Sequence, residues 1–298
     1  GSTRRGIAYV YGDKYMKKGV RMGDLLHMDT LLPRLKDIVE WKNLTLQKVY
    51  GADPIDFDQL VAWLNENFAP VRDFVCDTSL FLDQAARDGK KILFEAQLGA
   101  LRDIDFGIYP YTSSSSTIAA YAPVGAGIPN HRLDSVVGII KAYSSCVGEG
   151  PFTCEMFGDE AEALRKAGNE YGAATGRPRR VGPFDAVASR YGIRCQKAQD
   201  IALTKLDVLG AFDKIPVITG YRLHGVLLDS FPTDSRLEEA EPVIEELPGW
   251  GCDISGCRSW KDLPENARKY VCTLEKLVDH PIYLVSTGAE RDAYLLRE

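Results

Sequence analysis

The residues best suited to chemistry follow a short apolar stretch of the chain. Ile201 to Thr204 reads as a buried strand, and Lys205 and Asp207 come directly after it. Ligand sites of open α/β sheets lie beyond the carboxyl ends of strands. A carboxylate there can accept hydrogen bonds from the N1–H and the exocyclic amine of a guanine, while the lysine stem lies along the ring. A solvated Lys and Asp at a strand end is the alternative, and on these four residues alone it is the simpler interpretation.

A second small group ends another predicted strand. Ser286, Thr287 and Gly288 follow Pro281 to Val285, and small residues with exposed backbone amides could close over the same base edge. The alternative is a simple glycine turn.

Two further segments could bind anions. Arg177, Arg179 and Arg180 follow a Thr-Gly turn, and guanidinium forks suit carboxylate or phosphate groups; a solvated basic turn is the other interpretation. The hydroxyl residues from Ser113 to Thr117 could hydrogen-bond phosphate oxygens, although serine runs are otherwise typical of flexible loops.

Composition limits the classes of function. A net charge of −6 argues against a broad nucleic-acid-binding face, which needs clustered, uncompensated Lys and Arg. No apolar run approaches the ~18 to 20 residues that span a bilayer. The seven cysteines are an odd number without metal-ligand spacing, and Cys252 and Cys257 have no second pair to complete a zinc site. Reduced thiols in a cytoplasmic protein are therefore expected. None of the four histidines has a convincing partner in sequence, so the pattern does not indicate a histidine-centred nucleophilic site.

The surrounding pattern predicts the elements that position these residues. The opening, 1–19, reads as an ordered loop, and 99–129 as a long polar connection, which in a compact domain is more often functional. We expect strands at 91–95, 136–142, 201–204, 217–221, 226–228 and 281–285, and helices at 58–75, 159–166, 185–199 and 263–278. Strands interleaved with helices favour an α/β fold with a central, mainly parallel sheet.

Taken in order, these segments resemble the adenylosuccinate synthetase family over nearly the whole chain. The matching segments are Gly1-Ser2-Thr3 with Arg5-Gly6-Ile7 and Asp13-Lys14, Gly19 to Leu26, Ile92 to Glu95, Asp103-Ile104-Asp105, Tyr109-Pro110-Tyr111, Val147-Gly148 with Gly150-Pro151-Phe152, Gly168 to Gly172, Thr175-Gly176-Arg177, Thr204 to Val208 and Ser286-Thr287-Gly288. The resemblance implies a layered fold like that of the P-loop NTPases, lacking its N-terminal part. It also implies one domain: a helical, dimerising region at 1–90, an IMP and aspartate-loop region at 91–200, and a guanine-binding region at 201–298.

The resemblance also implies a reaction and a set of contacts. The family joins IMP to L-aspartate with GTP and Mg²⁺: the γ-phosphoryl group activates the 6-oxygen of IMP, and the aspartate amine displaces it. By resemblance, IMP would contact Thr3, Lys17, Leu98, Ser113, Val147 and Arg177; the aspartate loop would hold Ala174, Thr175, Arg177 and Arg179; and GTP would contact Arg179, Lys205, Asp207, Ser286 and Gly288. Lys17 falls where the family has an arginine that reaches the IMP site of the partner subunit, which implies a homodimer.

Several positions depart from the family pattern. Lys17 keeps the charge of that arginine without its fork, and Leu98 stands where the family has a glutamine against the purine. Gln97 is adjacent, but on an extended strand a shift of one residue turns the side chain to the other face. Ala174 replaces a threonine, and Pro178 interrupts the arginine run.

The family's phosphate loop, Gly-Asp-Glu-Gly-Lys-Gly-Lys, has no match in this sequence, and the aspartate base, catalytic histidine and Mg²⁺ contacts belong to the same segment. No catalytic or metal-binding residue is therefore assigned, and a truncated copy with weak or no activity alone is expected. The alternatives are a non-catalytic relic or regulatory protein that binds purine nucleotides, and a phage-type relative that takes a guanine nucleotide in place of IMP. A missing early strand would also leave an open sheet edge.

Overall fold

The computed structural model describes residues 5–96, 98–172 and 176–297, which form two compact units. Residues 5–93 and 124–130 make up the helical unit, and residues 94–123 and 131–297 make up the sheet unit. Among the described residues, no helix is both long and apolar enough to cross a membrane.

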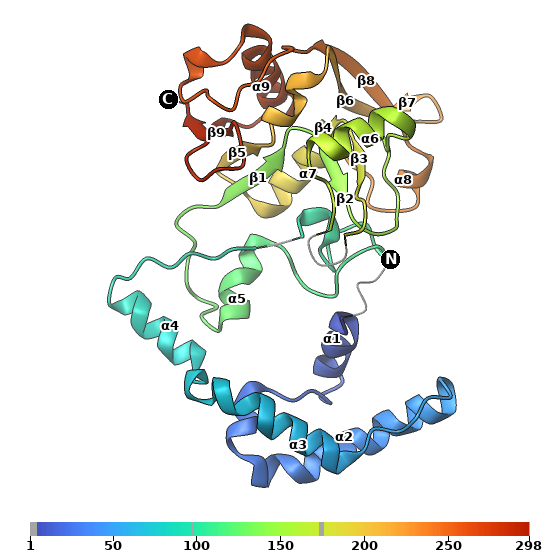
Figure 1. The fold of residues 1–298 in the computed structure, drawn as a ribbon, viewed down its shortest axis with the longest axis vertical. Helices are drawn as coiled ribbons and strands as arrows, with labels where there is room; N and C mark the ends of the chain where they lie inside the picture. The colour runs from blue at the N-terminus through green and yellow to red at the C-terminus, as the bar shows by residue number, and fades with distance from the viewer. Residues whose placement is uncertain (1–4, 97, 173–175, 298) are drawn as a thin grey trace. The chain divides into compact units, whose positions relative to one another are not determined.

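The helical unit is built from α-helices joined by short 3-10 segments (Figure 1). The α-helices are α1 (Ile7–Tyr15), α2 (Met28–Val49), α3 (Phe57–Phe68) and α4 (Thr78–Arg87), and the 3-10 segments are Met22–Leu26 and Ala69–Phe74. Acidic caps start two of the helices: the Asp56 carboxylate accepts from Gln59 N–H at 2.8 Å, and that of Asp77 from Leu80 N–H at 3.1 Å. These bonds satisfy amides that a first helical turn leaves without partners.

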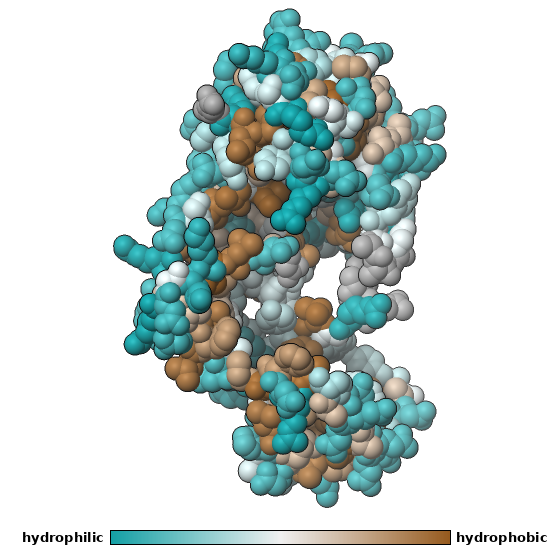
Figure 2. Space-filling view, turned by 60° about the vertical axis from the view of Figure 1, so that its left-hand side comes forward, coloured by the Kyte–Doolittle hydropathy of each residue, from teal (hydrophilic) through white to brown (hydrophobic). Residues whose placement is uncertain are grey.

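A small apolar core holds α2 and α3 together. Leu31, Leu35 and Val39 of α2 pack with Leu25 and Phe68. Other large apolar side chains of this unit are exposed, and the space-filling view shows apolar patches between hydrophilic ones there (Figure 2). They include Ile7, Tyr9, Val10, Tyr15, Phe74, Leu80 and Phe81.

Two local predictions are wrong. The opening does not read as a helix because no residue of α1 is buried and its apolar residues follow no stripe, so the pattern on which helix prediction depends is absent. Residues 91–96 form no strand, and Leu93 is 90% exposed. A short apolar run without alternation carries too little information to separate a buried strand from an exposed connection.

The main sheet of the sheet unit has the order β1-β5-β9-β10 (Figure 1). Its strands are β1 (Val137–Lys141), β5 (Asp200–Thr204), β9 (Ile282–Ser286) and β10 (Tyr294–Leu296). The first three are parallel, and β10 is antiparallel to β9. The predicted α/β fold with a mainly parallel sheet is confirmed.

Two smaller sheets lie in the same unit. One pairs β2 (Ser144–Cys146) with β3 (Arg180–Gly182) in antiparallel fashion. The other contains β4 (Phe184–Asp185), β6 (Lys214–Leu223), β7 (Val226–Leu227) and β8 (Glu241–Pro248), with β8 along nearly the full length of β6. The predicted hairpin across Gly225 is present as β6 and β7.

Helices complete the unit: α6 (Gly158–Ala167), α7 (Ala186–Gln196), α8 (Arg236–Glu239) and α9 (Glu265–Val278). The Asp185 carboxylate accepts from Ala188 N–H at 2.9 Å, which confirms it as the cap of α7. The predicted apolar stripe of α9 is also confirmed, since Tyr270, Val271 and Leu274 are buried. The Tyr270 hydroxyl donates to the Ala142 carbonyl at 2.6 Å, which fixes α9 against the residue that follows β1.

The connection at 99–129 is largely irregular, as predicted. It contains only the short helices η3 (Ala100–Arg102), η4 (Ala119–Tyr121) and α5 (Ala122–Ala126), the last at the boundary between the two units.

The strand β1 is an edge. Among the described strands it pairs only with β5, and Ile139 is 73% exposed. An apolar strand with an unpaired edge can pair with another chain, so the open edge expected from the sequence is present.

Candidate functional site

The parallel strands bring the two predicted guanine-binding segments to one edge of the sheet. In the β5–β9 ladder Leu203 lies opposite Val285, and the strands end one residue later, at Thr204 and Ser286. Lys205 and Asp207 therefore continue from the same edge as Ser286 to Gly288. The end of β1 lies alongside, because Lys141 is opposite Thr204.

Lys205 turns the chain sharply at this edge. Its φ of 63° lies in the left-handed region, which residues other than Gly, Asn and Asp rarely adopt. Its Nζ donates to the Gly168 carbonyl at 3.0 Å. The lysine thus connects the end of β5 to the segment that follows α6.

Asp207 begins a 3-10 helix, η5 (Asp207–Ala211), and is half-buried. It lies near the buried Tyr143, whose hydroxyl pKa is raised by burial, by the hydrogen bond to Glu170, and by the charges of Glu170 and Asp207. The carboxylate is therefore at the carboxyl edge of the sheet, where the sequence predicts it.

The turn after β9 is closed by its own hydroxyls. Ser286 Oγ donates to the Gly288 carbonyl at 2.9 Å, and Thr287 Oγ1 donates to the Cys257 carbonyl at 3.2 Å. A Cβ on Gly288 would lie 3.1 Å from the Ala293 Cβ, a crowded contact. The turn is therefore a tight loop held against the chain that precedes α9.

A buried carboxylate, Glu170, organises the neighbouring loop. Lys141 Nζ donates to its Oε1 at 2.8 Å, the Tyr143 hydroxyl to the same oxygen at 2.7 Å, and Arg179 Nη1 to Oε2 at 2.8 Å. Burial raises the pKa of Glu170, but these donors outweigh burial and lower the pKa to about 2. The side chain, 1% exposed, is ionised and fully engaged at neutral pH.

The predicted aspartate loop is the hairpin that begins at Glu170. Arg179 N–H donates to the Glu170 carbonyl at 2.9 Å, Gly172 N–H to the Arg177 carbonyl at 2.8 Å, and Tyr171 forms an antiparallel bridge with Pro178. Ala174 and Thr175, at the tip of this loop in the sequence, lie outside the described residues.

The three arginines of this loop have different surroundings. Arg177 is exposed. Arg179 holds Glu170, and Arg180 donates from Nε and Nη2 to Glu155 Oε2, at 2.8 and 2.5 Å. Arg179 and Arg180 therefore hold carboxylates of the protein itself, and Arg177 is the most exposed of the three.

Part of the hydroxyl cluster from Ser113 to Thr117 makes hydrogen bonds within the protein. The buried Asp103 carboxylate accepts from Ser116 Oγ at 3.0 Å and from Thr117 N–H at 2.6 Å, and Thr117 Oγ1 donates to the Gly99 carbonyl at 2.9 Å. Ser113 Oγ is 3.0 Å from Ser115 Oγ; the Ser113 side chain is half-buried, and the Ser115 side chain is buried. Ser113 is thus better placed for a ligand than Ser116 or Thr117.

The remaining predicted contacts that the structure describes lie in turns and loops. Leu98 is 55% exposed with a φ of 71°, so the expectation that an extended strand sets the faces of Gln97 and Leu98 does not apply. Val147 is 48% exposed and follows β2. Lys17 is exposed after α1, in the helical unit. Thr3 and Gln97 lie outside the described residues.

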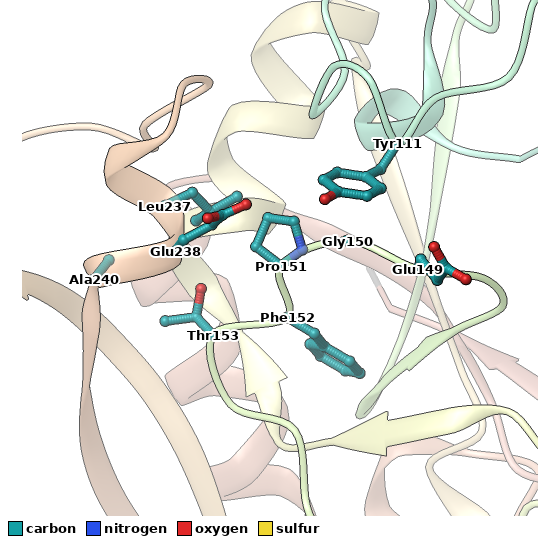
Figure 3. A pocket seen from close by; sticks show the side chains of 9 residues that line it. All are labelled: Tyr111, Glu149, Gly150, Pro151, Phe152, Thr153, Leu237, Glu238 and Ala240. Atoms are coloured by element: carbon teal, nitrogen blue, oxygen red, sulfur yellow. The ribbon is translucent and has the colours of Figure 1, made fainter. Parts of the chain in front are cut away.

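A cavity of about 370 Å³ adjoins the turn that follows Val147. Pro151 lies between Tyr111 on one side and Leu237 and Glu238 of α8 on the other (Figure 3). Its lining contains none of the predicted nucleotide contacts. The candidate site therefore comprises the ends of β5 and β9, the hairpin that begins at Glu170, and the segments that carry Ser113 and Val147.

The sequence pattern does not single out Glu170 or Arg102 as site residues, although both prove central to the geometry. The signal for Glu170 was an acidic residue between glycines, shortly before three arginines that need a counter-charge. Arg102 carries no comparable signal, because it donates to Tyr111, to Cys146 and to the turn after Cys146, which lie 9 to 47 positions away in the sequence.

Ligand-suited side chains at the carboxyl edge of parallel strands, beside an arginine-bearing hairpin, define an α/β protein with the site layout of nucleotide-binding enzymes. Comparison with known proteins gives the family. The family model for adenylosuccinate synthetase matches residues 1–295, and the chain belongs to this family of purine-biosynthetic ligases.

Curated relatives and a solved structure agree with this assignment. The chain is 45% identical to the adenylosuccinate synthetase of Pelobacter propionicus over 297 residues, 99% of this chain and 69% of the relative. It is 43% identical to that of Halothermothrix orenii, over 100% of the chain and 70% of the relative. The structure of fully ligated adenylosuccinate synthetase from Plasmodium falciparum matches with a TM-score of 0.93 at 34% identity, over 100% of this chain and 70% of the other.

Proposed function

We propose that the chain contributes the guanine, IMP and aspartate contacts of an adenylosuccinate synthetase, which joins IMP to L-aspartate at the expense of GTP. In this reaction the γ-phosphoryl group of GTP moves to the 6-oxygen of IMP. The amine of aspartate then attacks C6, and inorganic phosphate leaves with that oxygen. Family membership supports the reaction, and the arrangement of the strand ends supports the guanine contacts.

The observation that carries the proposal is the parallel pairing of β5 with β9. It places Asp207 and the Ser286–Gly288 turn after the same edge of the sheet. Asp207 accepts from the N1–H and exocyclic amine of guanine, Lys205 lies along the ring, and the turn covers the base edge. Adenine presents neither donor in that arrangement, so GTP is preferred over ATP.

The hairpin and the 113–147 region serve the other two substrates. Arg177, exposed beside the hairpin tip, binds the carboxylates of aspartate, while Glu170 holds Arg179 in place. Ser113 and Val147 contact IMP. Lys17 reaches the IMP phosphate of a partner subunit in a homodimer, a state that sedimentation analysis would test.

Among the described residues, no three His, Cys, Asp or Glu side chains gather closely enough to hold a metal ion. The described residues therefore do not fit a Mg²⁺ site by themselves, and we assign the metal no ligand and no step.

Calorimetric titration of the purified chain with GTP, ATP, IMP and inosine tests the proposal. GTP should bind at least tenfold more tightly than ATP. Asp207→Asn should weaken GTP at least tenfold, because two hydrogen bonds to a charged acceptor contribute about 1.5 to 3 kcal/mol each. It should also improve binding of xanthosine triphosphate, whose 2-oxygen can accept from the new amide.

The matched control is Asp213→Asn, since Asp213 is an exposed aspartate soon after η5. It should bind GTP as the parent does. Equal binding of GTP and ATP by the parent, or an Asp207→Asn variant with unchanged GTP affinity, would contradict the guanine assignment. An assay of adenylosuccinate formation then separates a ligase from a protein that only binds nucleotides.

A further inference from the structure

Two guanidinium groups donate hydrogen bonds to the backbone carbonyls of the turn from Val147 to Gly150, each to every second carbonyl. Arg102 donates to the carbonyls of Val147 and Glu149, at 3.4 and 3.2 Å. Arg180 donates to those of Gly148 and Gly150, at 3.3 and 2.8 Å. Three of these four bonds are at the long end of the hydrogen-bond range, so the turn depends on all of them together.

Arg102 also reaches a second segment. Its Nη1 donates to the Tyr111 carbonyl, and its own carbonyl accepts from Ser113 N–H at 2.8 Å. One residue thus joins the backbone at 111–113 to the backbone at 147–149. These segments hold Ser113 and Val147, which sequence alone leaves 34 positions apart.

The guanidinium group has no terminal donor to spare. Nη1 donates to the carbonyls of Tyr111 and Glu149, and Nη2 donates to Cys146 Sγ and the Val147 carbonyl. Each Nη carries two hydrogens, so four donors meet four acceptors. A lysine ammonium has three donors at one point and cannot span the same acceptors.

The base of this arginine is itself fixed. Arg102 ends η3, and the next residue, Asp103, is fully buried and accepts from Asp105 N–H, Phe106 N–H, Ser116 Oγ and Thr117 N–H. Burial raises the pKa of Asp103, but these bonds outweigh it and hold the pKa below its usual range. The side chain of Arg102 therefore extends from a rigid backbone.

We propose that Arg102 is a positioning residue for the purine monophosphate subsite. This inference rests on the proposed function, because it takes Ser113 and Val147 as contacts of IMP. Arg102 sets the separation of these two contacts, and its side-chain hydrogen bonds within the described part of the chain go to Tyr111 and to residues 146–149.

Titration of IMP and of GTP, separately, into the parent chain and into Arg102→Leu and Arg102→Lys tests this role. Both variants should bind IMP at least tenfold more weakly and GTP within twofold of the parent. A lysine should fail to rescue IMP binding, for the reason of geometry given above. The control is Arg222→Leu, because Arg222 is an exposed arginine that donates to a single carbonyl, that of Gly225; it should leave both affinities unchanged.

Several outcomes would overturn the role of Arg102. If Arg102→Lys binds IMP as tightly as the parent does, the guanidinium fork is not needed. If both variants lose IMP and GTP binding equally, the effect is a general structural one. If Arg102→Leu does not fold, Arg102→Lys alone decides. A parent chain that binds GTP but not IMP removes the subsite and this inference, whereas one that binds neither nucleotide refutes the proposed function itself.

Discussion

Replacing Glu170 by glutamine should lower the free energy of unfolding by an amount that shrinks as the pH falls. The Glu170 carboxylate has a pKa of about 2 in the folded chain, against 4.5 for an ordinary glutamate. At roughly 1.4 kcal/mol for each tenfold change in proton affinity, the difference corresponds to about 3 kcal/mol of stability at neutral pH. Lys141 and Arg179 would lose their counter-charge in the variant, which adds to the loss.

The sign follows from a pKa that is lower in the folded state. The stabilisation is fully present above the unfolded value of 4.5 and is lost as the pH falls through the folded value of about 2. The gap in unfolding free energy between parent and Glu170→Gln should therefore narrow by roughly 2 kcal/mol between pH 7 and pH 3. The window runs from about pH 5 down to about pH 2.

Urea unfolding, followed by circular dichroism at several pH values, measures this gap directly. The matched control is Glu246→Gln, whose carboxylate pairs with Lys214 at 2.8 Å but is 59% exposed. Its stability should track that of the parent at every pH, because exposed ion pairs contribute little. A gap for Glu170→Gln that is below about 1 kcal/mol at pH 7, or that does not change with pH, would refute the reasoning.

Two further substitutions test the packing around the site and the open edge. Gly168→Ala would place a Cβ 2.1 Å from the Tyr143 hydroxyl, so it should lower the free energy of unfolding by about 1 to 3 kcal/mol in urea titrations; an unchanged midpoint would show that Tyr143 moves freely. Ile139→Lys puts a charge on the exposed face of β1 and should reduce concentration-dependent light scattering without changing the circular dichroism spectrum; unchanged scattering would mean that association does not use this edge.

Segments with a clear local pattern could be predicted from the sequence, and segments without one could not. The stripe of α9 and the cap of α7 depend on local patterns, and both are confirmed. The helix α1 buries no residue, so its sequence has no apolar stripe from which a helix could be predicted. The predicted strand at 91–95 is absent, because no neighbouring strand or helix among the described residues buries the apolar residues of this run.

In the site, too, local motifs could be predicted from the sequence and contacts between distant segments could not. Short motifs after predicted strands indicated Asp207 and Ser286 correctly as strand-end residues, because parallel strands end at a common edge. The partners of Glu170 and Arg102 come from segments up to 47 positions away, and no spacing rule connects them. Which arginines of the loop hold Glu170 and Glu155 is likewise decided only by tertiary structure.

The backbone at Lys205 has a consequence for engineering. A left-handed conformation costs a non-glycine residue about 1 kcal/mol, and glycine adopts it freely. A library screened for heat resistance alone would therefore accept glycine at 205 and discard the ammonium group that reaches Gly168. Directed evolution of this chain should hold that codon constant, or impose a nucleotide-binding selection in every round.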